Sequence, residues 1–342
     1  MVDLPDDSLV LVTGANGFIA SHVVDALLAK GYRVRGSTRS ASKLAPLQEF
    51  WGAKYGPGRF QIAVVEDMAI KGAYEEALKD VAGVIHVAAS FPSTAAESLA
   101  NPALTIDPMV NGTRYILQSA AAQPTVKSFV LTSSSFAAIF REMNTVYDLD
   151  ENSWNHESVE KAYSLPMSDP LKFMHIYAAG KTLAEQAAWK FYNEEKPGFI
   201  MNSVIPNFTI GPPVGPERPR SSSLMVSTAV GGDMSGLKTL RPLKAEWFVD
   251  VRDAASLHVH ALISPQLSSG GIRIWAVSAP FNGNDILHVL RELHPDKNFP
   301  ADFEGLPRDL SRIDNRRGSE LLGGMRDLKQ AIQANTSHIN FI

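Results

Sequence analysis

"LVTGANGFIASHVV", residues 11–24, joins an apolar run to two glycines three positions apart, and apolar residues at helical spacing follow. The apolar run predicts a strand over residues 8–13, and the spacing after it predicts a helix over 17–30. A second strand is predicted over 32–38, which completes a strand–helix–strand unit. The first turn of such a unit is where a dinucleotide pyrophosphate meets backbone N–H groups at a helix N-terminus. The stretch therefore predicts a dinucleotide-binding turn.

The two glycines have separate roles in this interpretation. Gly14 permits the tight turn, and Gly17 lets the backbone approach a bound group, whereas Ala20 stands where a third glycine is common. The alternative is an ordinary strand-to-helix turn, since two glycines at this spacing recur by chance. The position in the chain and the complete unit favour cofactor binding. We expect the contacts from Gly14, Asn16, Gly17, Phe18 and Ile19.

The rest of the first two hundred residues continues to alternate between strands and helices. Further strands are predicted over 60–65, 83–87, 129–132 and 199–205, and helices over 43–54, 74–79, 103–122 and 174–194. An irregular polar stretch is expected over 144–170. This order predicts an α/β fold, a Rossmann-type doubly wound parallel sheet with right-handed crossovers.

The amino-acid composition changes from Pro206 onward, where "PNFTIGPPVGPERPRSSS" is rich in proline and glycine. We expect residues 1–206 to form an NADP-binding Rossmann domain and residues 207–342 to form mainly a smaller C-terminal substrate-binding lobe. Strands are predicted over 247–251 and 272–277, as segments that return to the main sheet. The two parts should pack together with a cleft between them.

Composition excludes several classes of protein. The 342 residues are 45% hydrophobic and 20% charged with a net charge of -4, and no lysine or arginine block could follow a nucleic-acid backbone. Without cysteine, neither disulfides nor thiolate metal sites can form. The acidic start "MVDLPDDS" does not resemble a secretory signal, and no apolar run reaches membrane-spanning length. We therefore expect a cytoplasmic protein that binds neither nucleic acid nor membranes, and leave its oligomeric state open.

The end of the second predicted strand indicates which dinucleotide binds. NAD-binding folds place an acidic residue there to hold the ribose 2'-hydroxyl, but this chain has no acid over residues 36–46. Arg39 offers a planar fork that matches a 2'-phosphate, and Lys43 adds a second cation. The alternative is that both cations are simply solvated. The absence of an acid favours NADPH as the cofactor.

A second group of reactive residues lies downstream. Tyr177 and Lys181 are four apart on a predicted helix and share one face, where the ammonium can favour ionisation of the phenol. Three serines, Ser133 to Ser135, end the strand in "FVLTSSSFAA". A tyrosine and a lysine at this spacing are commonly just helix surface. Together with the glycine turn and the serines, they predict a catalytic group.

These motifs resemble the extended short-chain dehydrogenase/reductase family. The similarity is to the dihydroflavonol-reductase-like branch, which includes fungal NADPH-dependent aldehyde, ketone and methylglyoxal reductases, and it covers nearly the whole chain. The matching stretches are "VTGANGFIASHVV", "VRGSTRS", "EDM" at 66–68, "GVIHVAAS", "VKSFVLTSS", "YAAGKTLAEQAAWKF" and "PNFTIGP".

The resemblance implies particular residue roles. The catalytic triad would be Ser134, in preference to Ser133, with Tyr177 and Lys181. Further cofactor contacts would come from Asp67 and Met68 beside the adenine, Val87 and Ala89 in a lining loop, Thr132 at the strand end, and Pro206 and Thr209 near the nicotinamide, with Tyr177 and Lys181 contributing as well.

The sequence departs from the family at two positions. Gly180 replaces a usual serine, which puts the rate or the substrate shape in doubt. Ile139 stands where plant flavonoid enzymes carry a substrate-binding asparagine, so a flavonoid substrate is not expected. We expect an apolar substrate pocket with few fixed charges. Its candidate residues are Phe91, Phe136, Met174, Phe208 and Pro213, although large apolar residues at such positions are often simply core.

The expected function is therefore NADPH-dependent reduction of aldehydes, ketones or ketoesters through a Ser-Tyr-Lys triad, with a small-molecule carbonyl as the partner. One alternative is an NAD(P)-dependent epimerase or dehydratase of a nucleotide sugar. Another is a non-catalytic, redox-sensing dinucleotide-binding protein, although such relatives lose the tyrosine and lysine that this chain keeps. No metal site is expected, because the histidines are scattered; His258 and His260, two apart, fall on different faces of a helix.

Overall fold

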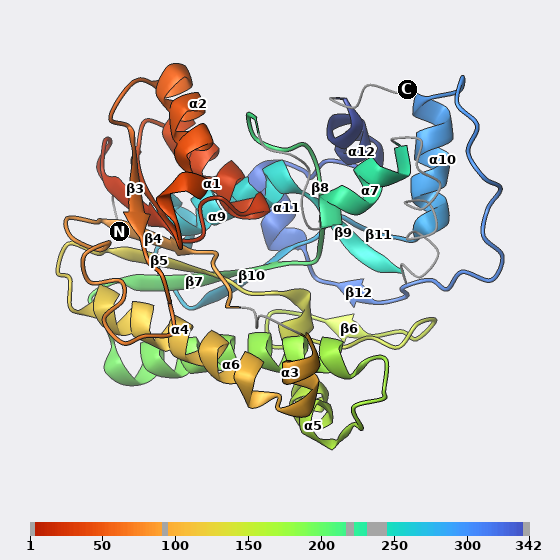
Figure 1. Cartoon of the computed structure of the whole chain (residues 1–342), viewed down its shortest axis with the longest axis horizontal. Helices are drawn as coiled ribbons and strands as arrows, with labels where there is room; N and C mark the ends of the chain where they lie inside the picture. The colour runs from red at the N-terminus through yellow and green to blue at the C-terminus, as the bar shows by residue number, and fades with distance from the viewer. Residues whose placement is uncertain (1–3, 91–94, 217–221, 231–244, 338–342) are drawn as a thin grey trace.

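A seven-stranded sheet forms the centre of the protein (Figure 1). The computed structural model describes residues 4–90, 95–216, 222–230 and 245–337. Every pair of neighbouring strands in the sheet is parallel, in the order β10-β7-β5-β4-β1-β2-β3. The strands are β1 (Leu9–Val12), β2 (Arg33–Thr38), β3 (Phe60–Val64), β4 (Gly83–His86), β5 (Ser128–Thr132), β7 (Ile200–Pro206) and β10 (Ile272–Ala276). Strand β1 lies inside the sheet, with β2 and β3 on one side of it and β4, β5, β7 and β10 on the other. The predicted doubly wound fold is therefore confirmed.

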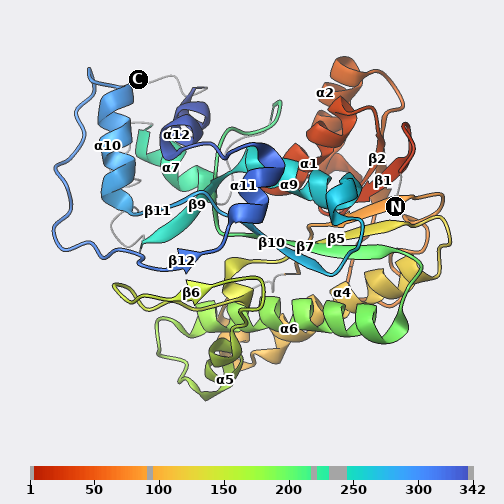
Figure 2. The same cartoon turned by 180° about the vertical axis from the view of Figure 1, so that it is seen from behind.

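Helices cover both faces of this sheet (Figures 1 and 2). On one face lie α1 (Phe18–Ala29), α2 (Ala45–Tyr55), α9 (Val251–Ile263) and α11 (Arg316–Leu322). On the other lie α3 (Ala95–Ala100), α4 (Ala103–Ala121), α5 (His156–Ser164) and α6 (Lys172–Glu195). Short 3-10 helices are η1 (Ala41–Lys43), η2 (Ser135–Ala137) and η3 (Pro265–Leu267).

The alternation of side chains along β1 divides the core into two layers. Val10 and Val12 belong to the cluster that contains α1 residues such as Leu27, whereas Leu11 belongs to the cluster on the opposite face, with Ile116 of α4. All four residues of β1 are buried. A strand covered on both faces reads as a continuous apolar run, which is why this segment of the sequence was informative.

A smaller sheet lies beyond β7. It has the order β11-β9-β8 and is built from β8 (Phe208–Ile210), β9 (Glu246–Asp250) and β11 (Ala279–Phe281). Around it lie α7 (Ser222–Val230), α10 (Gly283–Leu293) and α12 (Leu328–Thr336), and a two-stranded sheet pairs β6 (Asp148–Leu149) with β12 (Arg312–Ile313). Of the two strands expected to return to the main sheet, β10 does so. The other, β9, pairs only within the small sheet, because Phe208 follows β7 almost at once and offers β9 a closer parallel partner.

Two of the predicted elements are wrong. The segment predicted as a helix over 74–79 forms turns, bracketed by Gly72 at φ +83° and Asp80 at φ +61°, which leaves too few residues between them for a helix. The stretch expected to be irregular over 144–170 contains β6 and α5, the latter capped by the Asn155 side chain, which accepts from Ser158 N at 2.9 Å. The other predicted elements agree with the structure to within two residues at each end.

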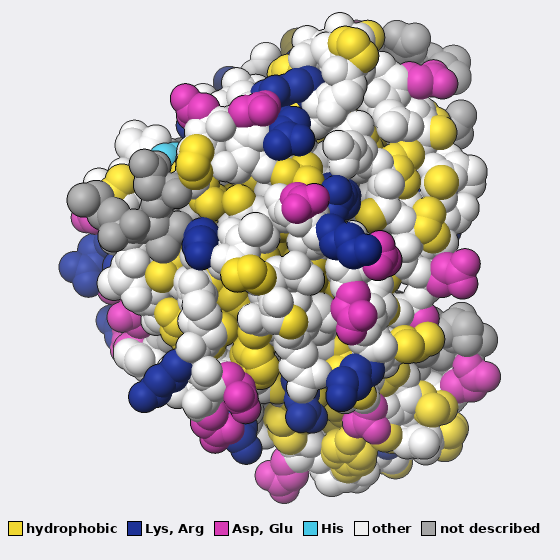
Figure 3. Space-filling model, turned by 90° about the vertical axis from the view of Figure 1, so that its left-hand side faces the viewer, with side chains coloured by type: hydrophobic (Ala, Val, Ile, Leu, Met, Phe, Trp, Pro, Cys, Tyr) yellow, Lys and Arg dark blue, Asp and Glu magenta, His cyan; other side chains and the backbone are white. Residues whose placement is uncertain are grey.

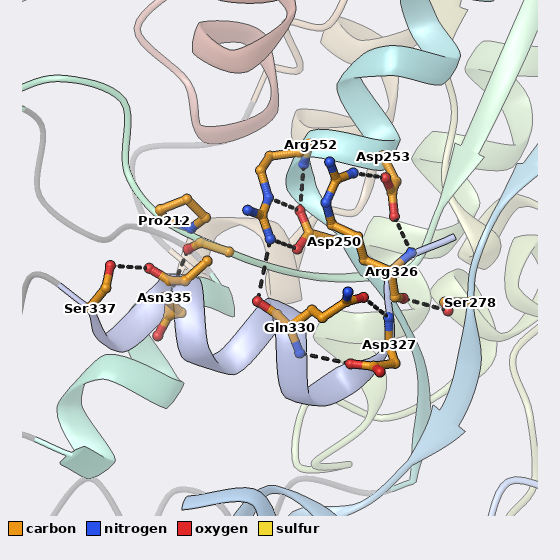
Figure 4. A network of polar contacts seen from close by, with 12 residues as sticks. Pro212, Asp250, Arg252, Asp253, Ser278, Arg326, Asp327, Gln330, Asn335 and Ser337 are labelled. Atoms are coloured by element: carbon orange, nitrogen blue, oxygen red, sulfur yellow. Dashed lines mark hydrogen bonds and ion pairs between the residues drawn. The ribbon is translucent and has the colours of Figure 1, made fainter. Parts of the chain in front are cut away.

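A polar network holds the C-terminal helix against the main body (Figure 4). Asp250 caps α9 and pairs with Arg252 at 2.6 Å, and Arg252 also donates to the backbone oxygen of Gln330 in α12 at 3.3 Å. Just before α12, the backbone N–H of Arg326 donates to Asp253 at 2.7 Å. These contacts fix α12, and the small sheet beside it, relative to α9.

Charges of both signs share the face shown in Figure 3, where Lys and Arg side chains lie among Asp and Glu. Among the helices that the structure describes, each is too short or too polar to span a lipid bilayer.

Candidate active site

The glycine turn lies at the carboxyl end of β1. Gly14 has φ +63°, and a Cβ at this position would lie 3.2 Å from Ala88. Gly17 is the N-cap of α1 without a side-chain hydrogen bond, and the first turn of that helix carries no acidic residue. The backbone N–H groups and the positive end of the helix dipole are therefore available to an anion, and close approach is possible because neither glycine carries a side chain.

A cavity of about 960 Å³ runs from this turn along the carboxyl ends of the strands. Every residue that the sequence predicted as a cofactor contact lines it. These are Gly14, Asn16, Gly17, Phe18, Ile19, Arg39, Lys43, Asp67, Met68, Val87, Ala89, Thr132, Tyr177, Lys181, Pro206 and Thr209. The cavity thus connects the glycine turn, the two cations after β2 and the tyrosine–lysine pair on α6.

The hydroxyls predicted to be catalytic lie together in the lining of this cavity. Ser134 is the N-cap of η2 and accepts from Phe136 N at 3.3 Å, which holds its side chain at the end of β5. A side-chain hydrogen bond joins Ser134 to Tyr177. One turn along α6, Lys181 Nζ donates to the Thr132 carbonyl at 2.8 Å. Three elements, β5, η2 and α6, therefore bring the predicted serine, tyrosine and lysine to one place.

Burial dominates the titration of this group. It raises the pKa of Tyr177 above 10.0, with the Ser134 hydrogen bond opposing the rise. Burial lowers the pKa of Lys181 to about 8, and the Glu185 charge opposes that change. The net pKa of Tyr177 is therefore raised, and not lowered as the neighbouring lysine had led us to expect, because desolvation of the buried phenol outweighs the effects that oppose it.

Gly180, which departs from the family pattern, faces α4. A Cβ there would lie 2.6 Å from Met109 Sδ and 3.8 Å from Ile106 Cα. The missing side chain therefore serves close packing of α6 on α4, and a serine would have to displace Met109.

A second cavity of about 440 Å³ opens beside the hydroxyls. Three of the predicted substrate residues, Phe136, Met174 and Phe208, line it. Phe91 lies outside the described residues, and Pro213 lines neither of the two cavities in the described part of the chain. Ser134, Tyr177, Asn207 and Ser222 line both cavities, so the two spaces meet at the reactive hydroxyls.

The second cavity also carries charge, which the sequence did not predict. Arg141 and Glu246 line it beside Phe140, Met143 and Leu171. Arg141 pairs with Glu246, and its Nε lies 2.8 Å from Asp309 Oδ2. Burial raises the pKa of Glu246, while the Arg141 charge opposes the rise. The expectation of few fixed charges is therefore wrong, because Arg141 and Glu246 come from segments that only the fold brings together.

Other lining residues were missed although the sequence carried a signal for some of them. Ser37, the penultimate residue of β2, and Ser90, which follows β4, line the large cavity, as polar residues at the ends of parallel strands commonly do. Asn207 directly follows Pro206, which was predicted. Ser222 had no local signal.

The histidines in the part of the chain that the structure describes do not form a metal site. His258, fully buried in α9, pairs with Thr132 Oγ1 at 2.8 Å and with the Ala254 carbonyl at 2.7 Å. Across the described residues, no His, Asp and Glu side chains gather in a group that could hold a metal ion.

The doubly wound sheet, the glycine turn and the adjoining Ser-Tyr-Lys group define a dinucleotide-binding protein of the Rossmann class. Residues 10–274 match the model of the NAD dependent epimerase/dehydratase family. The chain belongs to this family, and the resemblance to extended short-chain dehydrogenases/reductases is confirmed.

Three relatives are particularly informative. Aldehyde reductase 2 of Sporidiobolus salmonicolor is 46% identical over 340 residues, which cover 96% of this chain and 95% of that protein. Ketoreductase adrE of Penicillium rubens is 40% identical over 86% of this chain and 82% of its own length. The yeast methylglyoxal/isovaleraldehyde reductase Gre2, solved in complex with NADPH, superposes with a TM-score of 0.79 at 29% identity, over 97% of this chain and 98% of that one.

Proposed function

We propose that this protein reduces aldehydes, ketones or ketoesters to alcohols with NADPH. The observation that carries the proposal is the position of Ser134 and Tyr177, which line both cavities where the two meet. The relatives named as an aldehyde reductase and a ketoreductase support it. Its first test is NADPH oxidation, followed by absorbance, with a panel of aldehydes and ketones; no oxidation with any of them would refute the proposal.

The residues of the large cavity fit this cofactor. The glycine turn offers N–H groups to the pyrophosphate, and Arg39 with Lys43 offers positive charge to a 2'-phosphate. By the family's pattern, Asp67 and Met68 would flank the adenine, and Pro206 with Thr209 would contact the nicotinamide. NADPH would then extend from the cations after β2 to Tyr177.

The chain's own groups would act on the substrate oxygen. When bound, NADPH supplies a hydride to the carbonyl carbon. Tyr177 donates its proton to the oxygen as negative charge develops there, and Ser134 donates a hydrogen bond to the same atom. The Lys181 ammonium stabilises the phenolate that remains and holds the cofactor ribose. The hydride and the proton together account for both hydrogens gained by the alcohol.

Arg39→Asp tests the choice of cofactor. The substitution replaces a charge-assisted hydrogen bond to the 2'-phosphate with a repulsion. It should raise the KM for NADPH by about 10- to 150-fold. The ratio of kcat/KM with NADPH to kcat/KM with NADH should therefore fall or invert. Steady-state kinetics with both cofactors measures this. Arg114→Asp, an exposed change on α4, is the control and should leave the ratio unchanged. An unchanged ratio in the Arg39 variant would remove Arg39 from the 2'-phosphate site.

The second cavity should select hydrophobic carbonyl compounds. Burial of a phenyl-sized group by Phe136, Phe208 and their neighbours would contribute about 2 kcal/mol. The hydroxyls of a dihydroflavonol or a sugar would lose their hydration in this cavity, and the two charged side chains that line it, Arg141 and Glu246, are already paired with each other. With NADPH saturating, kcat/KM should rank aryl or alkyl aldehydes, ketones and ketoesters above those compounds. A dihydroflavonol or sugar nucleotide that outranks every simple carbonyl would contradict this assignment.

The two parts of the chain bind different molecules in the proposed reaction. We assign residues 1–206 to the NADP-binding domain and residues 207–342 mainly to the substrate-binding lobe, with α9 and β10 as segments that pack with the main sheet. The cytoplasmic location expected from the sequence stays a prediction.

A further inference from the structure

A small cavity lies beside Lys181 and is distinct from the substrate cavity, with which it shares no lining residue. Its volume is about 10 Å³, and Lys181 lines both this cavity and the large one. Its polar side chains, besides Lys181 and Thr132, are His86, Thr113, Ser133 and Glu185, and apolar residues such as Met68, Met109 and Leu131 complete the lining. A space of about this size is what a single buried water molecule needs.

Most polar groups around this cavity already have partners. Ser133 Oγ donates to Glu185 Oε2 at 2.5 Å, and Thr113 Oγ1 donates to the Met109 carbonyl at 3.0 Å. Glu185 also accepts two hydrogen bonds from Arg273. By contrast, His86 Nε2 is buried without a hydrogen-bond partner among the described residues. A buried polar atom of this kind calls for a partner.

The contacts of Thr13 determine which atom of His86 carries the proton. Thr13 Oγ1 accepts from the backbone N–H groups of Val87 and Ala88, both at 3.0 Å, and lies 2.9 Å from His86 Nδ1. A hydroxyl has one hydrogen and two acceptor positions, and the two backbone N–H groups fill the acceptor positions of Thr13. The Tyr74 hydroxyl also lies within hydrogen-bonding reach of Thr13, but it has a second partner in Ser37. We therefore assign the Thr13 hydrogen to Nδ1 and the Tyr74 hydrogen to Ser37. The pKa of His86 is lowered to about 3 by burial, so the ring is neutral. Its single proton therefore lies on Nε2, which is a donor.

We propose that the cavity binds one water molecule, which accepts hydrogen bonds from His86 Nε2 and from Lys181 Nζ, and that His86 is thereby a positioning residue for the catalytic lysine. This inference rests on the proposed function. The water would bring no charge of its own, but its oxygen would stabilise the ammonium form of a lysine that burial otherwise disfavours.

The groups around His86 determine how loss of the water would change the pH dependence of kcat. Tyr74 lies edge-on to the imidazole with ring centroids 6.2 Å apart, and burial raises its pKa, so it stays neutral. Phe129 packs on the ring from β5, and the charged groups at the cavity are Lys181 and Glu185. Burial lowers the pKa of Lys181 to about 8, so its ammonium is present below that pH and is lost above it. Loss of the water would lower this pKa further and move the alkaline limb of kcat to lower pH.

Two substitutions of His86 separate the roles of its two nitrogens. In His86→Asn the amide ends near the position of Nδ1, which keeps a partner for Thr13 but removes the donor to the cavity. In His86→Gln the amide reaches the position of Nε2, which keeps that donor. With NADPH saturating, the alkaline limb of the kcat–pH profile of His86→Asn should move to lower pH by about 0.4 to 1.1 pH units. This is the range expected for one lost hydrogen bond. The Gln variant should keep the wild-type limb.

Any other pattern overturns the inference. Equal limbs in the two variants, or a shift in the Gln variant alone, would show that the donor at Nε2 does not act on Lys181. Ala184→Val, which fills the cavity while keeping His86, is a second variant should His86→Asn fail to fold, and it should shift the limb in the same direction; an unchanged limb would refute the water site. A wild-type protein that reduces no carbonyl compound at any pH would instead refute the proposed function.

A measurement on the cofactor-free wild type needs no activity. In protein with 15N-labelled histidine, the His86 ring nitrogens should report a neutral imidazole protonated at Nε2, with magnetisation transfer from that proton to water. A ring protonated at Nδ1 would overturn the proposal.

Discussion

Tyr177→Phe is expected to lower kcat by about 100- to 10,000-fold, the range for loss of a general acid, while NADPH still binds. The substitution removes only the hydroxyl, and the ring keeps its edge-on contact with Phe136, whose centroid lies 5.9 Å away. In the proposed mechanism the phenol gives a proton to the substrate oxygen, and Tyr177 lines both cavities beside Ser134. Single-turnover kinetics with NADPH prebound measures the loss.

Tyr163→Phe is the matched control, since this tyrosine is 54% exposed on α5 and lines neither cavity. It should leave kcat unchanged. Near-normal turnover in a folded Tyr177→Phe variant that binds NADPH would exclude Tyr177 as the proton donor, and another group would then have to supply the proton.

Part of the cofactor cavity, the glycine turn and the cations after β2, was predictable from local rules, whereas Val87 and the other predicted lining residues were expected from the family resemblance. A glycine turn between a strand and a helix, and polar residues after successive strands, meet automatically when the strands are parallel. Gly14, Arg39 and Val87 each follow a different strand, and the order of the sheet brings them to one edge. The closeness of Tyr177 to Lys181 was predictable because the two share one helix face, whereas the choice of Ser134 over Ser133 came from the family resemblance.

The substrate cavity was less predictable because its walls come from distant segments without a shared period. Arg141, Glu246 and Asp309 meet only through the fold, and each alone is a charged residue in a polar stretch of sequence. Strand β9 pairs with β8 rather than with the main sheet. The pattern of apolar residues predicts that β9 is a strand, but it does not determine which strand lies beside it. Helix α5 did carry a local signal, the capping residue Asn155.

A buried ion pair connects the reactive helix to the edge of the sheet. Glu185, one turn beyond Lys181 on α6, accepts from Arg273 Nε at 3.0 Å and from Arg273 Nη2 at 2.9 Å. The side chains are 1% and 6% exposed, respectively. Burial acts to raise the pKa of Glu185, but Arg273 outweighs it and holds the pKa below its ordinary value of 4.5. Glu185 also accepts from Ser133, so the pair supports the segment that carries Ser134.

Arg273→Met should destabilise the protein by about 3 to 5 kcal/mol at pH 7, because it leaves the Glu185 charge buried without its partner. Urea denaturation of the cofactor-free protein measures the loss. Arg312→Met is the matched control: Arg312 makes the same two-pronged contact with Asp148, at 2.7 Å for both bonds, but the pair is exposed. It should leave the unfolding midpoint almost unchanged.

The pH dependence of that loss checks its cause. In the wild type, the pKa of Glu185 lies below its unfolded value of 4.5, so the pair stabilises the fold above about pH 4.5 and this contribution fades on further acidification. In Arg273→Met, burial acts without the arginine and raises the pKa of Glu185, so acid relieves the buried charge by protonating it. The difference in stability between wild type and variant should therefore shrink steadily from pH 7 toward pH 4. A difference that stays constant over this range, or equal losses in the Arg273 and Arg312 variants, would mean that lost packing of the arginine rather than an unpaired carboxylate destabilises the protein.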